Sequence, residues 1–204
     1  MKTLIELHFF PCLEYFYHLN RSELFILEAH ESFQKQSYRS RCEILSPNGV
    51  LSFNIPIIHG ETRNSIQTTL IEYKQNWVLI FWKTLEAAYK RSPYFDYFEM
   101  IFKPILFQKE ESLFNLNLKI LKGCIQFLSI NTKLVVTEKF NEQVMDVEDL
   151  RNTIFPKREK DLFLFSNYPQ NFGESFINNL SIIDLMMNEG PAGLITLISP
   201  QKSS

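Results

Sequence analysis

The sequence has little glycine and few cysteines, and each shortage excludes familiar classes of protein. Only 6 of the 204 residues are glycine, and the patterns GxGxxG, GxxxxGK[ST] and GxSxG do not occur. The usual dinucleotide-binding, P-loop and hydrolase interpretations therefore lack their motifs. The three cysteines, Cys12, Cys42 and Cys124, are widely spaced and odd in number, which excludes a disulfide framework and a CxxC zinc or redox motif. This usage favours a reducing cytoplasm.

The chain also lacks a strong net charge and long hydrophobic runs. Its formal net charge is -2 and its pI is near 6.1, so nothing draws the whole molecule to nucleic acid or to an acidic membrane. The densest apolar run, WVLIFW at 77–82, is far shorter than the ~20 residues that span a bilayer. The opening MKTLIELHFF is interrupted by Glu6 and His8 and is too short for a secretory signal. We expect a soluble cytoplasmic protein with no nucleic-acid partner and no membrane insertion, in which any anion site is local.

Aromatic residues are abundant by contrast. The chain has 19 Phe and 8 Tyr, which predict large, flat-sided contacts in the core. A chain of 204 residues suits one domain, which we expect over residues 1–198, with a disordered tail over 199–204.

The first third of the sequence is typical of strands. A short helix is expected at 13–20, between strands at 3–9 and 23–28. Residues 41–57 predict two strands joined by a turn at Pro47, Asn48 and Gly49, and 65–73 is a further strand candidate.

The middle of the sequence changes to a helical period. An aromatic stripe predicts a helix from Asn76 to Tyr89, with Asn76 as its N-cap. A second helix is expected to begin at Ser92 and Pro93 and to end or kink at Pro104. A third helix is expected over 112–130.

The last third begins with a strand expected in KLVVTEKF at 133–140, and residues 139–175 remain ambiguous. A short helix capped by Ser181 should stop at Gly190 and Pro191. The pattern as a whole predicts a single α/β or α+β domain, with a strand-rich N-terminal third packed on aromatic-rich helices.

The stretch HESFQKQSYRSRC, residues 30–42, concentrates basic side chains in one short connection. In an extended chain Lys35, Arg39 and Arg41 share a face, and in a helix Lys35 and Arg39 still do. Arginine forks and a lysine suit phosphate or carboxylate, so the stretch is a candidate anion clamp for a phosphorylated or nucleotide-linked substrate. The alternative is a solvated connection whose basic side chains pair with Glu28 or Glu31.

His30 is the candidate for proton transfer, because histidine titrates near neutrality. Glu28, two residues earlier, can share its face, whereas the adjacent Glu31 points to the other side of a strand. The alternative is a hydrogen-bonded or surface histidine. No ligand spacing joins the histidines into a metal site, even with His59 added, so we expect no metal and leave the cofactor unknown.

Two of the aromatic side chains are candidates for stacking on a substrate. Tyr94 and Phe95 stand beside Pro93 at an expected helix start, outside the stripe that predicts core packing. After the first strand, FFPCLEYFYHL has the Pro and His of a nucleotidyltransferase-like phosphate loop, but it lacks the glycine and the HxGH motif of such loops.

Five segments, in order, resemble the WbqC-like protein family, in the shorter form found in Bacteroidetes-type bacteria. They are FFPCLEYFYHL, EAHESFQKQSYRSRCEI, PNGVLSFNIPIIHG, WKTLEAAYKRSPYFDYF and NLSIIDLMMNEGP, and they cover almost the whole chain.

Two family patterns within these segments bear on the site. A Pro-x-x-Tyr pattern is matched loosely by Pro11 to Tyr15, with Cys12 where a second Pro is often found. A Gln-Lys pattern followed by aromatic-x-Asn-Arg is matched by Gln34, Lys35, Tyr38 and Arg41, with Ser40 in place of Asn. Through the resemblance, Tyr15 joins Lys35, Arg39, Arg41, Tyr94 and Phe95 as expected substrate-binding residues, beside His30 and Glu28 as expected catalytic residues.

The resemblance implies a role in surface polysaccharide biosynthesis of the O-antigen type, but it implies no particular reaction. The main hypothesis is a transferase that modifies a nucleotide-linked or lipid-linked sugar by acyl or aminoacyl transfer. The rival is a non-catalytic binding or scaffold protein that contacts other biosynthetic proteins through an exposed apolar patch around LMMNEGPAGLI, residues 185–195.

Overall fold

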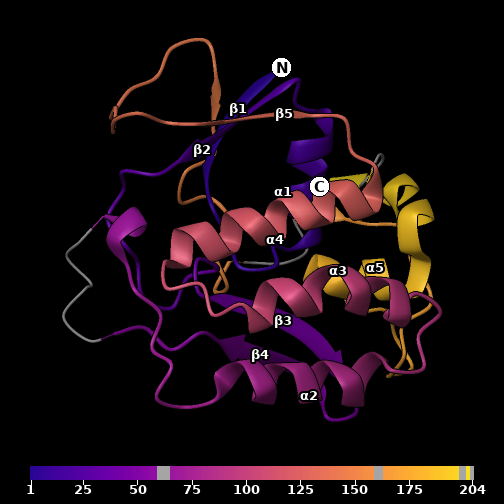
Figure 1. The fold of residues 1–204 in the computed structure, drawn as a ribbon. Helices are drawn as coiled ribbons and strands as arrows, with labels where there is room; N and C mark the ends of the chain where they lie inside the picture. The colour runs from indigo at the N-terminus through magenta and orange to yellow at the C-terminus, as the bar shows by residue number, and fades with distance from the viewer. Residues whose placement is uncertain (59–64, 159–162, 198–200, 203–204) are drawn as a thin grey trace.

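Four parallel strands form the sheet that positions the candidate site in the computed structural model (Figure 1). The structure describes residues 1–58, 65–158, 163–197 and 201–202. The strands, in the spatial order β5-β2-β1-β6, are β5 (Lys133–Val136), β2 (Leu24–Glu28), β1 (Lys2–Glu6) and β6 (Glu148–Asp149). Glu6 is level with Glu28 in the register. Because the strands are parallel, their carboxyl ends meet at one edge of the sheet.

The helix α1 (Leu13–Arg21) makes the crossover that the parallel pair β1 and β2 requires. Its residues Leu13, Tyr15, Phe16 and Leu19 are fully buried. The predicted strand–helix–strand start of the chain is therefore confirmed, although the first strand ends at Glu6.

An antiparallel hairpin follows the stretch 30–40. Its strands are β3 (Arg41–Ser46) and β4 (Gly49–Asn54), joined at Pro47 and Asn48 as expected. Gly49 has a φ of 96°, which a side chain disfavours.

Three long helices follow the hairpin in the chain. They are α2 (Trp77–Tyr89), α3 (Phe95–Phe107) and α4 (Leu113–Leu128), and α3 packs against both of the others. The helix α2 lies beside β4 in Figure 1. The side chain of Asn76 accepts the Leu79 N–H, so its N-cap role is confirmed. Among the described residues, no helix is long and apolar enough to cross a membrane.

Aromatic rings from the N-terminal third fill the space beneath these helices. Phe10 packs 5.4 Å from Phe102 and 5.9 Å from Phe81, and Phe98 stacks on Phe102 at 4.3 Å between ring centroids. The predicted packing of a strand-rich third on aromatic helices is confirmed, and the chain forms a single α/β domain.

The expected strand at 65–73 is wrong. Ser65 instead caps the short 3₁₀ helix η2 (Ile66–Thr68) by accepting the Gln67 N–H. Leu70 and Ile71 pair only through isolated bridges, because no continuous neighbouring strand is present there among the described residues.

The expected boundaries of the second helix also differ. The Ser92 hydroxyl bonds to Asn188 instead of capping, so α3 begins later, at Phe95. Pro104 lies inside α3 and does not end it. Proline has no N–H to donate to the carbonyl four residues earlier, which here belongs to the exposed residue Met100.

The C-terminal segment packs into the core. The helix α5 (Ile182–Glu189) begins after Ser181, whose hydroxyl accepts the Ile183 N–H, and continues into the 3₁₀ helix η4 (Gly190–Ile195). Leu185, Met186 and Met187 are fully buried, and the exposed apolar residues of 185–195 are Pro191, Ala192 and Ile195, so the continuous patch expected there is not present. The strands β7 (Phe163–Leu164) and β8 (Gln201–Lys202) pair with each other, and the rest of the expected tail lies outside the described residues.

We expect Gly190→Ala to lower the free energy of unfolding by about 2–4 kcal/mol. Gly190 has a φ of 61°, and an added Cβ would lie 2.4 Å from the Tyr94 ring. Gly49→Ala is the matched control, because its φ is also positive but nothing lies within 4 Å. Chemical denaturation should show the larger loss at Gly190, partly recovered by adding Tyr94→Ala. Equal losses at the two glycines would contradict the contact.

Candidate functional site

A pocket of about 610 Å³ opens where the strands of the parallel sheet end. We call it the edge pocket. Each wall follows the carboxyl end of a strand, and the lining residues are His30, Glu31, Ser32 and Gln34 after β2, Phe140 and Glu142 after β5, and Asp149, Arg151 and Asn152 at and after β6. The carboxyl edge is where open α/β sheets bind ligands, and the volume suits a small molecule.

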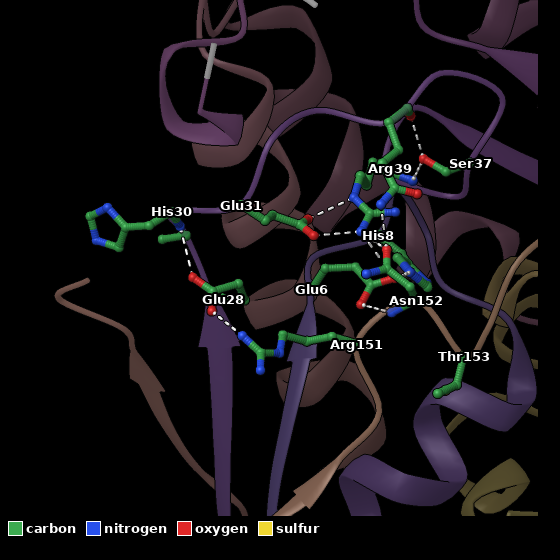
Figure 2. A network of polar contacts seen from close by, with 12 residues as sticks. Glu6, His8, Glu28, His30, Glu31, Ser37, Arg39, Arg151, Asn152 and Thr153 are labelled. Atoms are coloured by element: carbon green, nitrogen blue, oxygen red, sulfur yellow. Dashed lines mark hydrogen bonds and ion pairs between the residues drawn. The ribbon is translucent and has the colours of Figure 1, made fainter. Parts of the chain in front are cut away.

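A buried arginine lies behind the wall of the edge pocket, bound to its lining residues Glu31 and Asn152. The guanidinium of Arg39 donates from Nε and Nη2 to the two carboxylate oxygens of Glu31, each at 2.6 Å (Figure 2). Its Nη2 also lies 3.4 Å from Glu6 Oε1 and 2.8 Å from Asn152 Oδ1. Arg39 is 2% exposed, so its positive charge interacts with these partners and is not accessible to a ligand in the pocket.

Glu6 and His8 form the second part of this network. The pKa of His8 is lowered, mainly because burial disfavours the imidazolium, so the neutral ring donates from Nε2 to Glu6 at 3.1 Å. Burial by itself would raise the pKa of Glu6. The hydrogen bond from His8 and the positive charge of Arg39 oppose burial, and the pKa of Glu6 is lowered to about 2. Glu6 is therefore ionised under all ordinary conditions.

Opposing influences act on the pKa of Glu31, which is raised overall. Burial raises its pKa, the hydrogen bonds and charge of Arg39 oppose the rise, and the neighbouring Glu6 and Glu28 add to it. Burial alone would lower the pKa of Arg39, but its bonds to Glu31 and the charge of Glu6 raise it. The two 2.6 Å bonds between Arg39 and Glu31 have the bidentate geometry of a guanidinium paired with a carboxylate.

A second arginine binds the neighbouring carboxylates. Arg151 contacts Glu28 Oε2 at 3.1 Å from Nη1 and Asp149 Oδ2 at 2.6 Å from Nη2. Its guanidinium lies 5.1 Å from the centroid of the Phe140 ring. Arg151 therefore fixes both the acidic wall and the aromatic wall of the edge pocket.

The His30 ring is positioned by backbone. Its Nε2 lies 3.0 Å from the carbonyl oxygen of Thr137, and a carbonyl only accepts, so Nε2 carries the proton. In the neutral ring, Nδ1 is then the basic nitrogen. Glu28 does not touch the ring: its Oε1 accepts from the His30 backbone N–H and from the Thr137 hydroxyl. Figure 2 shows the ring pointing away from the Arg39 network.

The three basic residues of the stretch 30–42 do not converge as predicted. Arg39 points into the network, while Lys35 and Arg41 line a separate pocket of about 230 Å³, which we call the hairpin pocket. The prediction assumed an extended or helical chain. The segment instead turns at Gln36, whose φ is 57°, and this breaks the alternation of faces.

The aromatic candidates lie elsewhere. Tyr15 is fully buried and its hydroxyl donates to the Glu6 carbonyl oxygen at 3.2 Å. Phe95 is buried beside Trp82, and the half-buried Tyr94 ring faces Gly190. We therefore assign these three side chains to the framework and not to a pocket wall.

Sequence reasoning missed most of the edge pocket. Asp149, Arg151 and Asn152 fall in the region that local patterns left ambiguous. Asn152 has a φ of 59°, and its Oδ1 accepts from both Gln34 and Arg39. Glu6 lay inside the strand expected at 3–9 and was noted only as an interruption of the opening apolar run. Its place at the end of β1, level with Glu28, comes from the structure.

Metal ligation has no geometric support in the described part of the chain, where no group of three His, Cys, Asp or Glu side chains could hold an ion. His59, one of the histidines considered, lies outside the described residues.

We expect Arg39→Met to cost about 3–5 kcal/mol of stability, because it leaves Glu31 and Glu6 buried without their partner. Arg41→Gln should change the free energy of unfolding by less than about 0.5 kcal/mol, since its pairing with Asn54 is exposed. Urea denaturation of both variants checks the contrast. A tolerated Arg39→Met would show that its charge is not part of the framework.

The depressed pKa of Glu6 predicts a pH-dependent contribution to stability. A carboxylate whose pKa falls from 4.5 to about 2 on folding stabilises the protein above pH 4.5, and this gain is lost as the pH falls through 2. At about 1.4 kcal/mol per pKa unit, the gain is about 3 kcal/mol.

The difference in unfolding free energy between wild type and Glu6→Gln should therefore be largest near pH 7 and shrink below pH 4.5. Denaturation from pH 7 to 3 measures it. Glu23→Gln is the control, since the Glu23 side chain is 90% exposed and its effect should be small. A Glu6→Gln difference that did not change with pH would exclude the depressed pKa.

Comparison with known proteins gives one match. The WbqC-like protein family matches residues 7–161 and 152–195. No curated protein and no solved structure is similar enough to count as a match. Because the matched residues extend over most of the 204-residue chain, the protein belongs to the WbqC-like protein family.

Proposed function

We propose that the protein is an enzyme of surface polysaccharide biosynthesis that binds a sugar in the edge pocket and transfers an acyl or aminoacyl group to it. The observation that carries the proposal is the lining of this pocket. Phe140 offers an aromatic ring that is 51% exposed, and the amide residues Gln34 and Asn152 line the same pocket as the carboxylate of Asp149. Such groups suit the apolar ring face and the hydroxyls of a sugar.

The charge of the edge pocket supports a sugar over a bare phosphate. Glu31, Glu142 and Asp149 line it, against one guanidinium, that of Arg151. Arg151 is already bound to Asp149 and Glu28, and Arg39 behind the wall is bound to Glu31 and Glu6. The excess of carboxylates favours hydroxyl groups or a cationic amine and disfavours an anion.

His30 supplies the proton chemistry in this proposal. Its Nδ1 accepts the proton of a sugar hydroxyl or amine as that oxygen or nitrogen attacks the carbonyl carbon of an activated acyl or aminoacyl ester or thioester. The new ester or amide bond forms, and the bond to the leaving alcohol or thiol breaks as His30 returns the proton. The Thr137 carbonyl keeps Nδ1 basic by holding the proton on Nε2.

The carrier of the sugar is assigned to the neighbouring hairpin pocket. Lys35 and Arg41 line it, so a phosphate joined to the sugar can meet positive charge there. This keeps the expectation of a phosphorylated substrate but moves it away from Arg39. We place the reaction in the cytoplasm, because the three cysteines are free and buried.

The rival scaffold function has no comparable observation in its favour. It relied on an exposed apolar patch at 185–195, and the residues from Leu185 to Met187 are buried.

We expect Phe140→Ala to weaken sugar binding at least tenfold. Saturation-transfer NMR with glucosamine, N-acetylglucosamine and glucose measures the binding. Phe107→Ala is the matched control, because Phe107 is 43% exposed on α3 and does not line the edge pocket.

His30→Asn should keep the sugar signal but slow transfer from coenzyme A thioesters by about 10²–10⁴-fold, as measured by mass spectrometry. Absence of sugar binding in the wild-type protein would refute the proposal.

A further inference from the structure

We propose that the hairpin pocket binds a lipid phosphate, so that the sugar substrate is carried by a lipid and not by a nucleotide. The identity of the attached sugar rests on the proposed function. The binding of a lipid phosphate stands on the chemistry of the hairpin pocket itself.

Aliphatic side chains form much of this pocket. Ile55 is buried, Ile57 is half-buried and Ile58 is 37% exposed, all on the segment that leaves β4. The surface of Ile57 and Ile58 that remains in water gains by contact with a hydrocarbon chain.

The polar part of the hairpin pocket is cationic. Arg41 donates from Nε to Asn54 Oδ1 at 2.7 Å, which fixes its guanidinium while its two Nη groups have no partner in the described part of the chain. Lys35 likewise has no hydrogen bond or ion pair with any described residue. Among the described residues that line this pocket none is acidic, in contrast to the edge pocket. An anion is therefore attracted here and not at the edge pocket.

The lining disfavours a nucleotide. A nucleoside base is usually held by an exposed aromatic face. Of the described residues that line this pocket, Phe33 alone is aromatic and it is 6% exposed, while the other apolar lining residues are isoleucines. Two cations beside aliphatic walls match a phosphate attached to an alkyl or isoprenyl chain.

The two pockets share one segment of chain, which explains how a single substrate can occupy both. Gln34 lines the edge pocket, while its neighbours Phe33 and Lys35 line the hairpin pocket. A phosphate bound by Lys35 is thus one residue from the wall that contacts the sugar.

Isothermal titration with decyl phosphate below its micelle concentration tests the inference. The wild-type protein should bind decyl phosphate. Inorganic phosphate, which lacks the alkyl chain, and decyl glucoside, which lacks the phosphate, should bind at least tenfold more weakly. Arg41→Gln and Ile58→Asn should each weaken the binding of decyl phosphate at least tenfold. Arg91→Gln is the control, an arginine outside the hairpin pocket, and should leave binding unchanged. Thermal unfolding of each variant verifies that it is folded.

Three results would overturn the inference: no binding of decyl phosphate, unchanged binding in Arg41→Gln, or displacement of decyl phosphate by uridine diphosphate N-acetylglucosamine at equal or higher affinity. The glucosamine NMR signal separates the two proposals. If decyl phosphate does not bind but the glucosamine signal is present, only the lipid carrier is refuted. Binding of decyl phosphate without any sugar signal refutes the sugar site and leaves the lipid phosphate site supported.

Discussion

The buried guanidinium of Arg39 is the interaction on which the geometry of the site depends. It joins Glu31 after β2, Glu6 at the end of β1 and Asn152 after β6. Its backbone carbonyl also accepts the side-chain amide of Asn117 on α4. Burying this charge costs desolvation energy, which only close and nearly complete pairing offsets. The strand ends that form the edge pocket are therefore held in one arrangement by a single side chain.

The same pairing decides where charge is available. With Arg39 and Arg151 both bound to carboxylates, the edge pocket keeps an excess of negative charge. Lys35 and Arg41 have no acidic partner among the described residues, so positive charge is available at the hairpin pocket. The chain thus separates a carboxylate-rich pocket from a cationic, partly aliphatic one over a few residues. A substrate with a neutral or basic sugar at one end and a phosphate at the other fits this separation.

Local patterns in the sequence predicted the fold well but the site only in part. The crossover from β1 to β2 and the stripe of α2 depend on neighbouring residues, so periodicity was sufficient to find them. The role of Arg39 could not be found in this way, since it needs the turn at Gln36 and a partner, Asn152, that lies 113 residues away. The predicted convergence with Lys35 and Arg41 is wrong, because it requires an extended or helical segment and the backbone turns at Gln36.

The position of His30 depends on the sheet as well. Thr137 follows β5, and its backbone N–H donates to the Leu27 carbonyl, which continues the pairing of β5 with β2. Its hydroxyl accepts a hydrogen bond from the Ala29 N–H and donates one to Glu28, while its carbonyl oxygen accepts a hydrogen bond from His30 Nε2. One residue therefore fixes both the place of the imidazole and the nitrogen that is free to accept a proton. A shift in the register between β5 and β2 would move this carbonyl, so the proton chemistry proposed for His30 is tied to strand pairing and not to a nearby carboxylate.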